Sequence, residues 1–272
     1  MALDDVYFGN TDGGKHGYNP ENVKALKESI QTAYENCCDG IVETIHDEIV
    51  VPISTAWYAP EACKFFGSDE TGGILGTGLG AKKADAESLK VVVEKTGDTI
   101  FECFDAFRKD IESAGNNWYN NTSGESAGEG EEGAGNITLA ALSKKEMKLT
   151  VSEIEASDSE GNVVLDSAGV SAVSQKLTQV QENIKTKMTA EKEKLDAATS
   201  FIGGGQATAI QNCFGRLLEA IAKIFDWLTE GEDSLQKAFD GAMKKYSDVA
   251  TNIASVYNNA TFDKPGGEAG SN

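Results

Sequence analysis

The sequence is poor in basic residues and in proline. It has 24 lysines and arginines against 44 aspartates and glutamates, so its 272 residues carry a formal net charge of −20. Because phosphate backbones demand clustered basic side chains, this balance argues against nucleic-acid binding and against docking on anionic lipid. Only 4 prolines occur, which favours long uninterrupted helices because proline breaks helix interiors.

Residues that carry chemistry are also scarce. The two histidines, His16 and His46, belong to no cluster with metal-ligand spacing, and no nucleophile can be paired with a base. We therefore expect no enzyme activity, no metal and no cofactor. The five cysteines are an odd number without CxxC spacing, so we interpret them as small buried apolar residues rather than a disulfide framework.

Targeting signals are missing as well. The first residues contain no basic segment followed by an apolar one, so they do not form a secretory signal peptide. No apolar run reaches the roughly 18 residues that a membrane-spanning helix needs. A secreted or cell-surface location would therefore require export without a cleaved signal.

What the sequence does contain is helical periodicity. Asn19 and Pro20 form a helix start, with an N-cap residue followed by proline at the first helical position. Apolar residues then recur at spacings of three and four up to about Val51, where Pro52 disturbs the helix. A second helical stretch covers roughly 81–118.

Two further helices are predicted in the second half. Asp166 and Ser167 cap the third, which ends at Ser200. The fourth begins near Gln206 and keeps its register to Ile253, and only Glu232, beside Gly231, breaks it. The pattern resembles one coiled-coil seam on a helix roughly 50 Å long.

The only plausible strand pair lies between the two halves. The segment Met147–Ile154 is rich in β-formers, and turn residues at 157–162 precede Val163–Leu165, which could pair back. The sequence thus predicts a mainly α fold: two long helical hairpins packed as a four-helix bundle, with a small β-hairpin inserted between them.

This organisation divides the chain into five parts. Residues 1–119 form the first hairpin, 120–136 a Gly/Glu-rich linker, and 137–166 the small β-hairpin. Residues 167–262 form the second hairpin, and 263–272 a disordered tail.

The breaks inside the two hairpins have the same pattern of an aromatic residue, any residue and a small residue. The first runs from Trp57 to Ala59, and the second from Phe201 to Gly203. We interpret the small residue as permitting a sharp reversal and the aromatic as a plug at the hairpin end. In the alternative, Trp57 with Tyr58 is exposed and grips a partner.

This arrangement resembles the WxG-motif family of small type VII secretion substrates, the early secreted antigens. The resemblance covers roughly 20–118 and 168–258, and it implies a tandem fusion whose halves act as the two partners of a dimer. Both motifs depart from the family pattern, with Ala59 in place of Gly and Phe201 in place of Trp. The family's export signal, Tyr followed four positions later by Asp or Glu, is absent from this sequence.

Two other segments suggest chemistry only weakly. The Gly-rich segment 76–83 lacks the GK[ST] ending of a phosphate loop and does not follow a strand. His46, Asp47 and Glu48 could suggest an acid–base dyad, but residues two apart on a helix do not face each other, so we interpret them as a polar patch.

Three further patterns are more typical of structural roles than of chemistry. Asp158, Glu160 and Asn162 alternate as calcium ligands can, but the series is shorter than an EF-hand loop requires. Trp118 and Tyr119 close the second helix as a hydrophobic end-plug or, in the alternative, as an interface anchor. The stripe of aromatics at Phe225, Phe239 and Tyr246 is typical of core.

Two functional hypotheses remain. In the first, the protein is a non-enzymatic secreted or cell-surface helical protein that acts through protein–protein contacts. In the second, it is a self-assembling structural subunit of a bacteriophage particle or extracellular filament. A pore-forming toxin would need a more strongly apolar hairpin than this chain offers.

Overall fold

The computed structural model describes residues 20–69, 87–122, 137–199 and 205–260. Within these residues the chain is mainly α-helical with one small antiparallel strand pair, and this confirms the predicted fold class. The predicted linker past Thr122 and the predicted tail lie outside the described residues.

The first long helix continues further than the sequence predicts. α2 (Pro20–Ile45) buries the predicted apolar face and passes into a π-helical turn, η1 (His46–Val50), and then α3 (Val51–Ser54). Pro52 therefore lies inside the helix rather than at its end. Proline removes one backbone donor and crowds the preceding turn, and the wider π turn just before it provides the local change in register.

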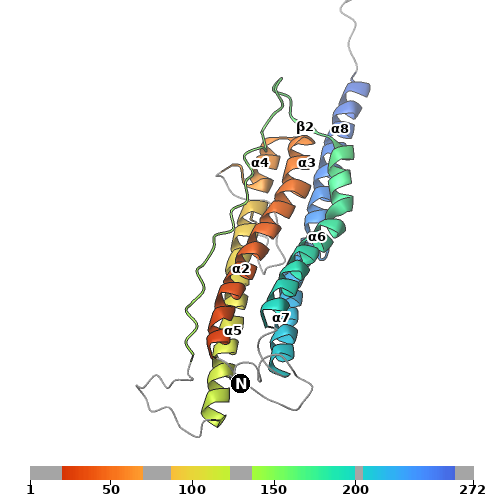
Figure 1. The fold of residues 1–272 in the computed structure, drawn as a ribbon. Coiled ribbons are helices and arrows are strands. Elements are labelled where there is room, and N and C mark those ends of the chain that lie inside the picture. Colours follow the sequence, from red (N-terminus) through yellow and green to blue (C-terminus); the bar gives the residue numbers. More distant parts are fainter. Residues whose placement is uncertain (1–19, 70–86, 123–136, 200–204, 261–272) are drawn as a thin grey trace, which may run out of the picture.

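Four helices pack lengthwise around a common core. α5 (Leu89–Thr122) runs back along α2, and α6 (Ser167–Thr199) contacts α2 on its other side. α7 (Gly205–Ile224) lies against both α6 and α5 and closes the bundle. Figure 1 shows α6 running antiparallel to α7 and to the last helix, α8.

The predicted fourth helix is not continuous. α7 ends in a 3-10 turn, η3 (Phe225–Leu228), and α8 (Leu235–Asn258) begins only after a turn. Gly231 has a φ of +93°, which favours glycine, and the Ser234 side chain accepts a hydrogen bond from the Lys237 amide as the N-cap of α8. The prediction of one uninterrupted helix was therefore wrong, because these two residues stop one helix and start the next.

The strand pair has a different partner from the one predicted. β2 (Val164–Leu165) pairs antiparallel with β1 (Trp57–Tyr58), so the pairing joins the start of α6 to the end of the first helix. Met147–Ile154 forms no strand, and the predicted hairpin between it and Val163–Leu165 was wrong. The predicted turn does form, with Gly161 at a φ of +84°, but it returns the chain to Trp57.

Residues 137–155, which we call the strap, run as extended chain along α2 and α5 (Figure 1). Its large apolar side chains enter the core: Ile137, Leu139, Leu142, Met147, Leu149, Val151 and Ile154. An extended segment packed on helices has no neighbouring strand, so its backbone groups need other partners.

Side chains of the two helices supply these partners. The amides of Asn116 and Gln31 each bond both the N–H and the C=O of one strap residue, Ile137 and Ser143 respectively. The Tyr34 hydroxyl donates to the Lys145 carbonyl at 3.1 Å and accepts from the Lys145 amide at 3.0 Å.

Leu139 is held by two side chains of α5. Its carbonyl accepts from Arg108, and its amide donates to Glu112. Four strap residues are thus fixed through their main chain by five helix side chains, in place of a sheet.

We predict that Tyr34→Phe destabilises the protein. The change keeps the ring but removes both hydrogen bonds to the partly buried backbone of Lys145, and a typical lost hydrogen bond costs about 0.5–1.5 kcal/mol. Urea unfolding followed by circular dichroism measures the loss. Tyr58→Phe is the matched control, because the described residues provide no hydrogen bond for the Tyr58 hydroxyl. Equal stability of the two variants would contradict the tethering role of Tyr34.

Candidate functional site

Trp57 lies at the centre of an aromatic cluster. Its side chain is fully buried, and its ring packs against Phe65 and Phe66 of α4 (Pro60–Phe66) with centroid distances of 5.7 and 6.4 Å. Tyr246 of α8 meets it edge-on, and the indole Nε1 donates to the Tyr246 hydroxyl at 3.3 Å. Phe239 stacks on Phe65 at 5.6 Å. The cluster therefore joins the first helical half to α8.

Ala59 is small for a different reason from the one expected. Its φ of −164° is ordinary extended backbone, so no sharp reversal requires a small residue there. Ala59 is fully buried instead, and its amide donates to the carbonyl of Glu155 in the strap at 3.1 Å. Phe201 and Gly203 lie outside the described residues, as do the side chains of Trp118 and Tyr119 at the end of α5.

We predict that Trp57→Ala lowers the free energy of unfolding by about 3–5 kcal/mol, because it removes a large buried ring and leaves a cavity. Tyr257→Ala, at a residue 76% exposed, should change it by no more than about 0.5 kcal/mol. Chemical denaturation measures both variants. If Trp57→Ala left stability unchanged and abolished partner binding, Trp57 would be a contact residue rather than a plug.

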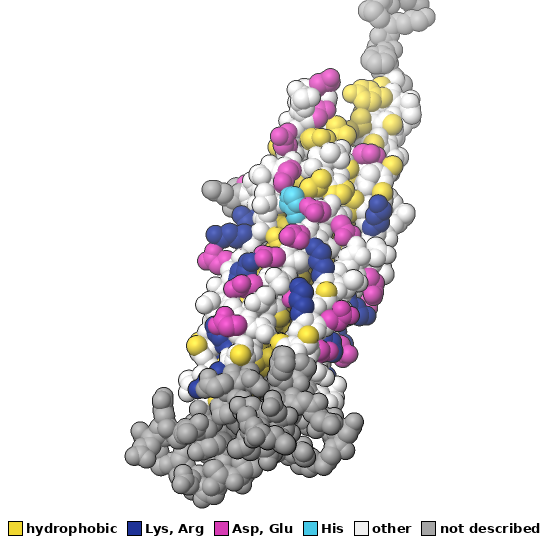
Figure 2. All heavy atoms as spheres, viewed as in Figure 1, with side chains coloured by type: hydrophobic (Ala, Val, Ile, Leu, Met, Phe, Trp, Pro, Cys, Tyr) yellow, Lys and Arg dark blue, Asp and Glu magenta, His cyan; other side chains and the backbone are white. Residues whose placement is uncertain are grey.

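The exposed large hydrophobic side chains of the described residues gather at one end of the molecule. They lie in α3, in β2 and the residue just before it, and in the last turns of α8, all at the upper end of Figure 1. Figure 2 shows hydrophobic side chains there. Lower on the same face, acidic and basic side chains alternate. We call this region the apolar end; its members are Val51, Val163, Val164, Val249, Ile253, Val256 and Tyr257.

The exposure rises steadily along α8. Leu235 and Phe239 are fully buried, whereas Val249 is 51% exposed and Val256 is 70% exposed. The apolar register predicted a packed seam along this whole face, but among the described residues no helix packs on its last turns. We call residues 249–258 the α8 tip. The signal that could have revealed it is the absence of any charged residue from 249 to 262.

His46 connects the π turn to the strap. Its Nδ1 is 2.8 Å from the Asp47 carboxylate, and its Nε2 is 3.0 Å from that of Glu153. A neutral imidazole has only one N–H, so both contacts are satisfied together only by the charged ring. The hydrogen bond to Asp47, followed by that to Glu153, raises the pKa of His46, and the bond from His46 lowers the pKa of Glu153.

We predict a pH window for this link. A raised histidine pKa adds stability that is complete below the ordinary value of 6.5 and is lost as pH rises through the folded-state value. A lowered glutamate pKa adds stability that is complete above 4.5 and is lost as pH falls through the folded-state value.

His46→Gln should therefore cost most between about pH 4.5 and 6.5, and the cost should shrink as pH rises. Urea midpoints for both proteins across pH 4 to 8 measure this dependence. A difference that stayed constant with pH would contradict the charged pair.

The side chains of the other polar motifs make hydrogen bonds within the fold. Glu48 does not face His46, because it accepts from the Asn183 amide of α6. Asp158 accepts from the backbone amides of Glu160 and Asn162, and the hydrogen bonds from Asn162 lower its pKa. The Gly-rich segment 76–83 lies outside the described residues.

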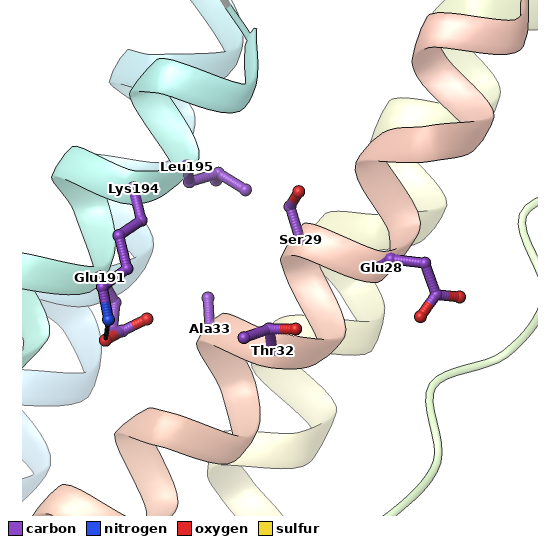
Figure 3. A pocket seen from close by; sticks show the side chains of 7 residues that line it. All are labelled: Glu28, Ser29, Thr32, Ala33, Glu191, Lys194 and Leu195. Atoms are coloured by element: carbon purple, nitrogen blue, oxygen red, sulfur yellow. Dashed lines mark hydrogen bonds and ion pairs between the residues drawn. The ribbon is translucent and has the colours of Figure 1, made fainter.

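The bundle surface has several hollows, of about 230, 410 and 640 Å³, and the smallest of these, between α2 and α6, is shown in Figure 3. It has a volume of about 230 Å³, and its charged lining is paired, because Lys194 contacts Glu191 at 2.5 Å. Ligand pockets usually measure about 300–1,000 Å³. The hollow brings together no nucleophile and base, and it contributes no chemistry that the sequence did not offer.

Three of the five cysteines are buried as predicted: Cys37, Cys38 and Cys63. For Cys103 and Cys213 the prediction was wrong, because both are only partly buried. Burial raises the pKa of the Cys37 thiol and raises that of Cys38 to about 11. Over the described ranges, no three His, Cys, Asp or Glu side chains are grouped so as to hold a metal ion. In the same part of the chain, no helix has the length and apolar character needed to cross a membrane.

Comparisons with protein-family models, curated proteins and solved structures found no match to this chain.

Proposed function

We propose that this protein is a non-enzymatic helical bundle that acts through protein–protein contacts at its apolar end. The observation that carries the proposal is the concentration of exposed Val, Ile and Tyr side chains at that end. Contiguous exposed apolar surface rimmed by polar residues is typical of interaction sites. The net charge of −20 favours a protein partner over nucleic acid or an anionic membrane.

Two biological settings fit this proposal. The first is a secreted or cell-surface protein exported without a cleaved signal, as the resemblance to WxG-motif type VII substrates implies. Two observations support it: α2 and α5 form an antiparallel pair, and Trp57, which lies between them in the sequence, is fully buried. The second is a self-assembling subunit of a phage particle or filament, which an uncharged helix end on an acidic chain supports.

We predict position-specific cross-linking at the apolar end. A photo-reactive phenylalanine analogue in place of Ile253 should join the protein to a protein partner in the producing cells. The same analogue in place of Thr251, on the opposite face of α8, is the control. Gel mobility and mass spectrometry of the adducts measure the result.

The location of the adducts separates the two settings. Adducts in the medium or on the cell surface support export, and adducts found only in purified particles support the structural subunit. Failure of the label at 253 to join any protein would contradict the proposed function.

A further inference from the structure

We infer that the partner of the α8 tip is a second copy of this chain, and that two tips pair antiparallel as a short two-stranded coiled coil. This inference rests on the proposed function and names the partner for the same surface. Three observations carry it: the register of the apolar stripe, its lack of charge, and the direction from which it is open.

The stripe has coiled-coil register without interruption. Along α8, apolar residues recur at alternating spacings of four and three: Leu235, Phe239, Ala242, Tyr246, Val249, Ile253 and Val256. The first members are buried against α4 and α6, and the last three are at least half exposed. The same face that binds helices inside the bundle therefore continues past it, where none of the described helices covers it.

The tip is also the part of α8 that needs a partner for its own stability. Eight of its ten residues are Val, Ile, Thr, Ser, Asn or Tyr, which are weaker helix formers than Ala, Leu, Glu or Lys, and the other two are alanines. The ion pair between Lys244 and Asp248 is the last one along α8 in the described residues. Helical stability in such a segment comes mostly from packing of its apolar face.

The absence of charged side chains at the tip favours a second, equally uncharged tip over a charged partner. Asp248 and Asp263 bound 14 residues without a single charged side chain, in a chain of net charge −20. Two copies repel each other everywhere else, and here they can approach without an unpaired charge. The small residues Ala250 and Ala254 lie beside the stripe and allow close approach of the two helices.

Geometry sets the direction. A parallel partner helix would have to occupy the space along α8 that α4 and α6 already fill. An antiparallel helix can approach from beyond the apolar end. The two-fold axis that relates the two copies then passes near the middle of the paired tips. The second copy's last turn would then approach the exposed Val163 and Val164 of the first, which gives these valines a partner too.

The test uses the full-length protein in sedimentation equilibrium from about 1 µM to about 500 µM, a range that brackets weak dimers. We expect wild type to shift from monomer to dimer with concentration. Added NaCl should strengthen the association, because it screens the repulsion between acidic copies and breaks no interfacial ion pair.

The matched variants add the same charge to opposite faces of the tip. Ile253→Asp with Val256→Asp should abolish dimer formation, whereas Thr251→Asp with Asn258→Asp should retain it. The tip lies outside the core, so both should keep the wild-type unfolding midpoint, and Ile253→Ser with Val256→Ser provides an uncharged second test of the seam.

A monomer at every concentration, or equal loss of dimer in both charged variants, would overturn the inference. Monomeric protein that instead sediments with neutral phosphatidylcholine vesicles would overturn it in favour of a lipid surface. If the purified protein is monomeric while the label at 253 still joins another protein in cells, pairing of copies fails and the proposed function stands.

Discussion

α6 buries a row of apolar side chains, interrupted between Met188 and Leu195 by the buried Glu191. This row joins α2 on one side of the helix to α7 and α8 on the other. Its members are Val170, Val173, Leu177, Val180, Ile184, Met188 and Leu195. Because α6 begins at Ser167, the packing it offers α8 stops there, while α8 continues to Asn258. The helix that assembles the bundle thus also determines where the apolar end starts.

The strap shows how an extended segment can be buried on helices without a sheet. Every buried amide and carbonyl needs a partner, and here side chains spaced four residues apart on α5, at 108, 112 and 116, supply several of them. Gln31 and Tyr34 do the same from α2. These bonds fasten the centre of the chain to its first half, and the Trp57 cluster fastens α8 to the same half.

The sequence predicted the long helices well, because burial of one face imposes spacings of three and four that are visible locally. It did not predict the strap, since alternation at Met147, Leu149 and Val151 is the same for a strand and for an extended segment on helices. The partners of that segment, such as Gln31, lie more than a hundred residues away. The partner of Val164–Leu165 was missed for the same reason.

For the candidate site, the sequence could single out Trp57 but not the α8 tip. An aromatic residue between two amphipathic helices is a local pattern, whereas the exposure of Val249 or Ile253 depends on where another helix begins. The break at Gly231 and Ser234 did have a local signal, because Glu232 interrupts the apolar register beside Gly231. Local periodicity reports which face is apolar and does not report what covers it.

The tethers of the strap also make its docking depend on two helices at once. The hydrogen bonds between Tyr34 and Lys145 join residues 111 positions apart, and Asn116 and Arg108 bind the strap from a different helix. The full set of tethers can therefore form only when α2 and α5 lie side by side. Contacts this distant in sequence carry a loop-closure entropy, and folds rich in such contacts generally fold more slowly.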